Sequence, residues 1–138
     1  MSTLCGVVVN DESELDTELR ANTALIEFPA SGTITLSGGG TTNSLFPINS
    51  DLQFDTVSQT TTIDGNSGTL NGASGYAGFF VRGGTAIIQD LTIQNCYTSG
   101  GDGNAGGTSG RDGGAGGGGA GMGGGLFVED GANVTLSN

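Results

Sequence analysis

The sequence contains no lysine, histidine or tryptophan, and its only basic residues are Arg20, Arg82 and Arg111. Fourteen acidic residues give the chain a formal net charge of −11. A nucleic-acid-binding surface needs clustered Lys and Arg, and an anionic membrane repels an acidic protein, so we expect neither partner. No apolar run approaches the roughly 20 residues of a transmembrane helix, so no membrane insertion of this segment is expected.

Glycine is abundant and is concentrated in residues 99–125, where 16 of the 27 residues are glycine. The flanking segments, residues 79–90 and 126–138, share one pattern: an aromatic-valine strand, a charged turn with glycine, and a second strand. Phe80 and Phe127 are then equivalent positions, 47 residues apart. Without the tract about 20 residues remain, which is typical of one solenoid repeat. We therefore interpret the tract as a lateral insertion on one repeat.

A short helix is predicted near the N-terminus. Asp11 and Glu14 form a capping-box pattern, and acidic side chains are favoured at the positive end of a helix dipole. Leu15 and Leu19 share one helix face, and Asn22 is a suitable stop. A helix of about ten residues is unstable alone. We therefore expect Leu15 and Leu19 to form a structural cap on the open end of a solenoid.

The rest of the chain has the pattern of short strands separated by turns rich in Gly, Asn, Ser and Asp. A Thr-Ile or Thr-Leu pair recurs at Thr35, Thr62, Thr92 and Thr135, at intervals of 27, 30 and 43 residues. Such loose spacing favours an all-β fold of the parallel β-helix kind over a propeller or a leucine-rich repeat. We divide the single domain into a cap of strand, helix and strand (1–30), repeats (31–98), the glycine-rich insertion (99–125) and a truncated next repeat (126–138).

The two cysteines, Cys5 and Cys96, are not expected to pair. They would lie about three repeats apart in a stack whose spacing is about 4.8 Å per repeat, whereas a disulfide needs Cα atoms within about 7 Å. A buried free thiol is the expectation for Cys96. The first residues do not form a secretion signal. The composition nevertheless favours an exported protein from which a signal was removed.

Several of these segments together resemble a known group. They are the strand-helix-strand pattern of residues 7–28, the Thr-Ile segments at 32–36 and 62–66, residues 83–95, and the glycine stretch 113–125 before an apolar strand. The order resembles the start of right-handed parallel β-helix proteins of the pectin-lyase-like superfamily, in particular bacterial surface and autotransporter-like adhesin passenger domains. The resemblance implies a right-handed solenoid and an extracellular, bacterial cell-surface location. It specifies no single function, because the group spans adhesins, lyases and phage tailspikes.

The side chains needed for catalysis are scarce. A polysaccharide lyase of this fold would be expected to use acidic Ca²⁺ ligands and a basic proton abstractor, for which only Arg82 is available. We interpret Arg82 instead as a solvated turn residue that neutralises a nearby acid. A glycoside hydrolase needs two carboxylates across a groove, and nothing in the sequence pairs Asp51, Asp55, Asp64 and Asp90. No enzymatic activity is expected from this segment.

A weak calcium signal lies at the start of the glycine tract. Residues 100–104 begin like the Gly-Gly-x-Gly-x-Asp repeat of calcium β-rolls, but Ala105 occupies the sixth position and the motif is not repeated. The candidate Ca²⁺ ligands are Asp102, Asn104 and Asp112. No other cofactor is expected.

The glycine tract has two interpretations: a flexible exposed loop, or an ordered loop whose glycines pack backbone against backbone and meet a flat partner. The candidate binding surface comprises Gly113, Gly116, Met122 and Tyr97. The expected partner is a host-cell or glycan surface.

The leading hypothesis is a non-enzymatic extracellular β-helix module, acting as a stalk or adhesin of a bacterial surface or secreted protein. One alternative is the N-terminal part of a carbohydrate-active β-helix, similar to polysaccharide lyases or hydrolases, with its catalytic repeats beyond Asn138. Another is a structural fibre unit that self-associates through its open repeat ends.

Overall fold

The computed structural model describes residues 5–37, 53–54, 59–100 and 124–138 of the 138-residue chain. Within these residues it contains one helix and nine strands. The helix is α1 (Glu12–Arg20), and the strands are β1 (Val7–Val8), β2 (Leu25–Glu27), β3 (Thr33–Thr35), β4 (Gln53–Phe54), β5 (Thr60–Asn71), β6 (Phe79–Val81), β7 (Thr85–Gln94), β8 (Leu126–Val128) and β9 (Asn133–Ser137).

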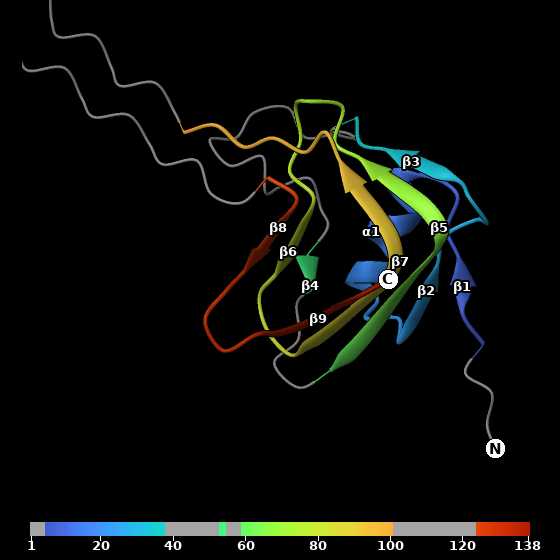
Figure 1. Cartoon of the computed structure of the whole chain (residues 1–138). Coiled ribbons are helices and arrows are strands. Elements are labelled where there is room, and N and C mark those ends of the chain that lie inside the picture. Colours follow the sequence, from blue (N-terminus) through green and yellow to red (C-terminus); the bar gives the residue numbers. More distant parts are fainter. Residues whose placement is uncertain (1–4, 38–52, 55–58, 101–123) are drawn as a thin grey trace, which may run out of the picture.

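The strands form two sheets, and every pairing between them is parallel. The larger sheet has the order β1-β2-β5-β7-β9, with β3 also paired to β5, and the smaller sheet has the order β4-β6-β8 (Figure 1). From β5 onward the chain alternates between the sheets, and each strand pairs with the strand two elements earlier. The strand-rich, all-β class predicted from the sequence is therefore confirmed.

The two longest strands, β5 and β7, each contain a corner. The register between them shifts between Asp64 and Gly68. At this point Asn66, Ser67 and Asp90 all have positive φ, between 47° and 59°. Asn and Asp tolerate this left-handed backbone better than most residues. The first half of β5, before the corner, pairs with β2, and the second half, after the corner, pairs with β3.

The register confirms the internal repeat but corrects its length. Phe80 lies opposite Phe127 and Ile88 opposite Leu136, which is the alignment with a one-residue gap that the sequence suggested. The expected repeat of about 20 residues was too short, since Ile63 and Ile88 pair at a separation of 25 residues. The additional residues lie in the corners within the long strands and in the turns between the two sheets.

The register also explains the loose spacing of the recurring Thr-Ile and Thr-Leu pairs. Thr62 and Thr135 do share one position, because both lie opposite Ile87. Thr92 instead lies opposite Thr69, on the other side of the corner. The irregular intervals in the sequence arose because two different positions carry similar residues.

The predicted helix is confirmed with its cap. Asp11 is the N-cap, and its carboxylate accepts a hydrogen bond of 2.9 Å from the Glu14 N–H. In a regular capping box the Glu14 carboxylate would accept from the Asp11 N–H. Here it accepts from the N–H of the preceding residue, Asn10, at 2.7 Å. The helix ends where Asn22 adopts a φ of 58°. Arg20 in the last turn pairs with Asp16 at 2.7 Å.

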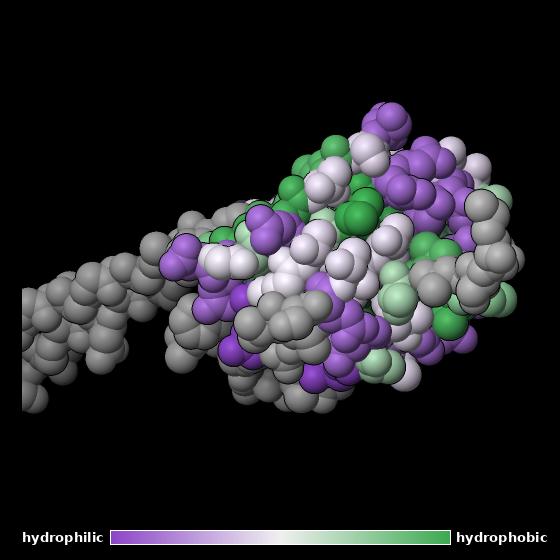
Figure 2. All heavy atoms as spheres, turned by 90° about the horizontal axis from the view of Figure 1, so that it is seen from below, coloured by the Kyte–Doolittle hydropathy of each residue, from purple (hydrophilic) through white to green (hydrophobic). Residues whose placement is uncertain are grey.

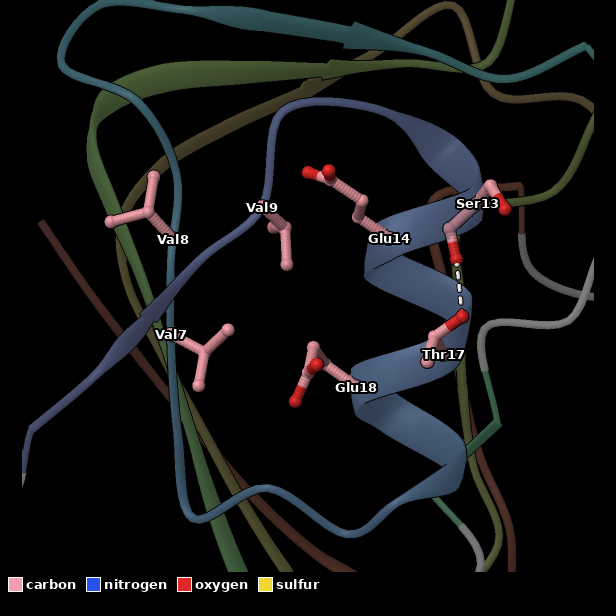
Figure 3. Close-up of a pocket in the computed structure, with 7 residues that line it drawn as sticks. All are labelled: Val7, Val8, Val9, Ser13, Glu14, Thr17 and Glu18. Atoms are coloured by element: carbon pink, nitrogen blue, oxygen red, sulfur yellow. Dashed lines mark hydrogen bonds between the residues drawn. The ribbon is translucent and has the colours of Figure 1, made fainter.

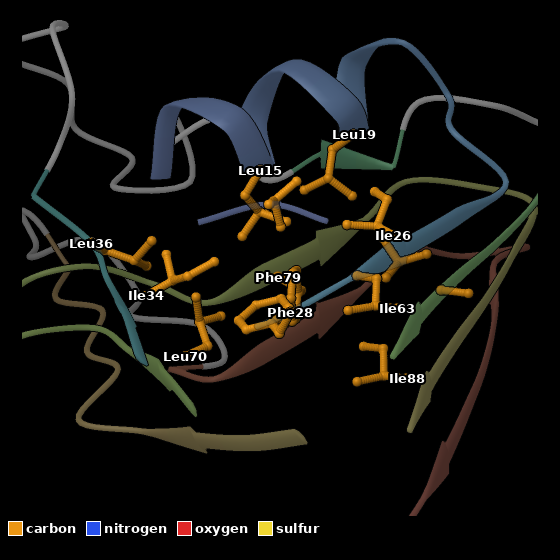
Figure 4. Close-up of a cluster of buried hydrophobic side chains, with 13 residues drawn as sticks. Leu15, Leu19, Ile26, Phe28, Ile34, Leu36, Ile63, Leu70, Phe79 and Ile88 are labelled. Atoms are coloured by element: carbon orange, nitrogen blue, oxygen red, sulfur yellow. The ribbon is translucent and has the colours of Figure 1, made fainter. Parts of the chain in front are cut away.

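The core lies between the sheets and beneath α1. Leu15 and Leu19 point from the helix toward side chains of both halves of the larger sheet and toward Phe79 of β6 (Figure 4). Both leucines are essentially buried, at 0% and 2% exposure. The buried cluster comprises Val9, Leu15, Leu19, Ile26, Phe28, Ile34, Leu36, Ile63, Leu70, Phe79, Val81, Ala86 and Ile88.

Candidate functional site

The acidic residues at the first corner are occupied by hydrogen bonds within the fold. The Asp64 carboxylate accepts from the Asn66 N–H at 3.0 Å and from the Gln89 side chain at 2.8 Å. The Asp90 carboxylate accepts from the Ser67 hydroxyl at 3.1 Å. The bond from Asn66 lies within β5, whereas those from Gln89 and Ser67 join β5 to β7, so both carboxylates help to hold these neighbouring strands together. The other two candidate acids, Asp51 and Asp55, lie outside the described residues.

A second corner is built from asparagines. The Asn71 side-chain oxygen accepts from the Ala73 N–H and from the Asn95 side-chain amide, both at 3.1 Å. Asn95 has a φ of 52°, a left-handed backbone conformation that asparagine tolerates at tight corners. The two asparagines are 24 residues apart and are offset by one position, because Asn71 lies opposite Gln94 in the ladder. Their hydrogen bond links the ends of the neighbouring strands β5 and β7.

Arg82 has the environment expected of a solvated turn residue. Its Nε lies 3.7 Å from a Glu129 carboxylate oxygen, and about half of each side chain is exposed. Exposed ion pairs of this kind contribute at most about 1 kcal/mol to stability.

Tyr97 lies where the chain enters the glycine tract. Its side chain is 54% exposed, and its N–H donates to the carbonyl of Tyr76, one repeat earlier, at 2.9 Å. On the returning side of the tract, a Cβ added to Gly124 would lie 2.8 Å from the Cys96 carbonyl oxygen. Glycine at position 124 therefore allows the returning chain to pack directly on the backbone beside Tyr97.

Both cysteines are free, as predicted. Cys5 is exposed, whereas Cys96 is half-buried rather than fully buried. Burial raises the pKa of the Cys96 thiol, and a hydrogen bond with the Gly72 backbone acts in the opposite direction. The thiol donates weakly to the Gln94 carbonyl at 3.5 Å. Cys96 is consequently a protonated, weakly nucleophilic thiol at neutral pH.

The calcium hypothesis and most of the binding-surface hypothesis fall outside the described residues. This applies to the candidate ligands and surface residues Asp102, Asn104, Asp112, Gly113, Gly116 and Met122. Over residues 5–37, 53–54, 59–100 and 124–138, no group of three or more Cys, Asp and Glu side chains is arranged to hold a metal ion.

A groove of about 240 Å³ lies between β1 and α1. It is lined by Val7, Val8, Val9, Ser13, Glu14, Thr17 and Glu18. Figure 3 shows the side chains of Val7 and Val9 directed into this space, with Glu14 and Glu18 reaching toward them from the helix. The groove thus combines an apolar strand with an acidic helix face.

Sequence reasoning did not identify this groove. Val7 and Val8 are exposed for valines in a strand, at 38% and 51%. The available signal was the spacing of Glu14 and Glu18, which places both acids on one helix face. Only the packing of the helix beside β1 turns that face toward the valines.

The molecular surface mixes hydrophobic and hydrophilic residues, and the face in Figure 2 carries hydrophobic patches among polar ones. The large hydrophobic residues that are exposed are Val7, Val8, Tyr97, Val128 and Leu136. In the part of the chain that the structure describes, no helix is long and apolar enough to cross a membrane.

No protein-family model, curated protein or solved structure matches this chain.

Proposed function

We propose that this chain is a right-handed parallel β-helix and acts as a non-enzymatic stalk or adhesin module of an extracellular, bacterial cell-surface protein. The observation that carries the proposal is the stacking of equivalent residues one repeat apart. Ile63 lies opposite Ile88, and Phe80 lies opposite Phe127 with their ring centroids 5.1 Å apart. A solenoid whose repeats lie in parallel register brings like residues together in this way.

The course of the chain supports the same architecture. Only short turns separate β5, β6 and β7, although β5 and β7 are parallel neighbours in one sheet and β6 belongs to the other. A βαβ crossover would place a helix between such parallel neighbours. Here the second sheet takes the place of that helix, as expected for a chain that winds around its own core.

The use of the described acids supports a structural rather than a catalytic role. The Asp64 and Asp90 carboxylates accept hydrogen bonds that join repeats, and Arg82 faces Glu129 at the surface. An assay for lyase activity on polygalacturonate with Ca²⁺ tests this part of the proposal. We expect no unsaturated product by ultraviolet absorbance, and turnover would overturn the non-enzymatic assignment.

An adhesin should bind a surface through exposed groups, and Tyr97 is the exposed aromatic residue at the base of the glycine tract. The test is binding of the purified protein to a glycan array and to cultured epithelial cells. We expect the Tyr97→Ser variant to lose binding by several fold, since the aromatic face that stacks on a sugar is removed. Val128→Ser is the matched control, because it removes a comparably exposed apolar side chain from β8. Equal binding by both variants would exclude Tyr97, and no binding by the parent would refute the adhesin role.

One observation favours self-association as a second candidate function. Leu136 on β9 is 61% exposed, and β9 pairs with β7 alone among the described strands. An open strand edge beside an apolar side chain favours pairing with another chain. Sedimentation at increasing concentration should show assembly by the parent and none by Leu136→Lys. A parent that stays monomeric throughout would rule this candidate out.

A further inference from the structure

The groove between β1 and α1 contains a strand edge that pairs with no other strand among the described residues. The Val9 N–H donates to the Glu27 carbonyl of β2 at 2.9 Å. In a parallel ladder alternate residues face the same neighbour, so Val7 also faces β2 while the N–H and C=O of Val8 face the other side. Of the strands that the structure describes, β1 is the terminal one on that side (Figure 1). No described strand pairs with the backbone of Val8 on that side, so this edge can accept a further strand.

Carboxylates surround this edge. Glu14 and Glu18 project from α1 over the groove (Figure 3). One oxygen of Glu14 accepts from Asn10, and one oxygen of Glu18 accepts from the Thr23 hydroxyl, which fixes both side chains in place. On the other face of β1, Glu27 lies so close to Gly6 that an added Cβ there would be 2.4 Å from its carboxylate oxygen. Three acids therefore flank a two-residue strand.

We propose that this groove binds an extended peptide with basic side chains at alternate positions, which adds to β1 as a further strand. Addition of a strand to an open sheet edge is a common mode of peptide recognition. Alternate side chains of a strand are about 6.6 Å apart, and Glu14 and Glu18 are separated by about 6 Å along the helix axis. Two lysines at alternate positions therefore match the two glutamates.

The groove also suits the rest of a lysine side chain. Val7 points into it and is 38% exposed, so the methylene stem packs on Val7 while the ammonium group reaches a glutamate. Charge argues against a second copy of this chain as the occupant. With 14 acidic residues, three arginines and no lysine, another copy would bring mainly like charge to the groove.

The test uses the fluorescein-labelled peptide TKTKTKT and the full 138-residue chain, with binding followed by fluorescence anisotropy at low salt. We expect saturable binding that weakens as salt rises, and no binding of TETETET. The double variant Glu14→Gln and Glu18→Gln should bind about tenfold more weakly, which is the combined loss of two partly exposed charge pairs. Glutamine keeps an acceptor for Asn10 and Thr23, and circular dichroism checks that the helix is intact.

The matched control is Glu129→Gln with Asp130→Asn, which removes the same charge from the turn before β9. We expect this variant to bind like the parent. An equal loss of binding in both double variants would overturn the proposal, because attraction to net negative charge alone would explain it. Binding that appears only after removal of residues 1–4 would overturn it too, since the groove would then belong to the chain's own N-terminus.

Strand addition is tested separately with two N-methylated peptides. One carries methyl groups on the lysine amides and the other on the threonine amides. Only one set of amides can face β1, so one methylated peptide should bind like the parent peptide and the other should not bind. Equal affinity of both methylated peptides would contradict strand addition. This experiment does not depend on the adhesin function, so the two proposals fail independently.

Discussion

Replacing Leu15 with alanine tests whether α1 is an integral part of the core or only lies against it. Leu15 is fully buried and shares the cluster with Leu19, Val9 and Ile26. Removing a buried leucine side chain costs about 2–5 kcal/mol, depending on how far the site collapses. A domain of this size has a total stability of about 5–15 kcal/mol. At roughly 3 °C per kcal/mol, the melting temperature should fall by about 6–15 °C.

The assay is thermal and urea unfolding followed by circular dichroism. Thr17→Ala is the control on the same helix, because Thr17 is exposed and its hydroxyl bonds only the local Ser13 carbonyl at 2.8 Å. We expect this control to shift stability by less than about 0.5 kcal/mol. The double variant Leu15→Asp and Leu19→Asp should abolish cooperative melting, since it buries two unpaired charges. A Leu15→Ala protein that melts within a degree of the parent would show that the helix does not close the core.

The remaining predictions concern the turns between repeats. Gly78→Ala should destabilise the fold by about 2–3 kcal/mol, because the added Cβ would lie 2.1 Å from the Gly125 carbonyl oxygen. Gly75→Ala is the control, since the nearest atom to its added Cβ is 4.0 Å away. Equal urea midpoints of the two variants would contradict the close approach at Gly78. Asn71→Ala should lower the free energy of unfolding by about 1–2 kcal/mol, because it removes the acceptor for the Ala73 N–H and the Asn95 amide. An unchanged urea midpoint would show that these two hydrogen bonds are dispensable. Alkylation of Cys96 should reach its half-maximal rate at a higher pH in the folded chain than in urea, since burial raises the pKa of this thiol. The unfolded chain then loses the thiol proton first as pH rises, so the contribution of Cys96 to stability declines above its unfolded pKa. Coincident pH profiles in the folded and unfolded chain would refute this.

Local signals in the sequence were sufficient for the helix and for most strands. Asp11, Leu15 and Leu19 specify the start and the buried face of α1 because capping and a 3.6-residue period act within a few neighbouring residues. The match between Phe80 and Phe127 was readable for a related reason. Stacked repeats place similar side chains in similar surroundings, so equivalent positions retain similar residues.

Local sequence signals did not predict the length of the repeat. Thr62 and Thr92 look alike in sequence but occupy different ladders, because both flank corners where a β-branched residue suits an extended strand. Local preference cannot distinguish two such positions. Pairing between strands decides the register, and the paired residues are 25 positions apart for Ile63 and Ile88.

The sequence by itself determined the strand-rich class, the helix cap, the free cysteines and the acidic character, since these depend on composition and on neighbours along the chain. Only the tertiary structure decided which acids are available to a partner. Asp64 and Asp90 hydrogen-bond across repeats, whereas Glu14 and Glu18 overlook an open strand edge. The four side chains carry the same charge and the same chemistry. All four accept hydrogen bonds, but Asp64 and Asp90 bond to a neighbouring strand, whereas Glu14 and Glu18 bond to residues near the helix and line a groove beside Val7.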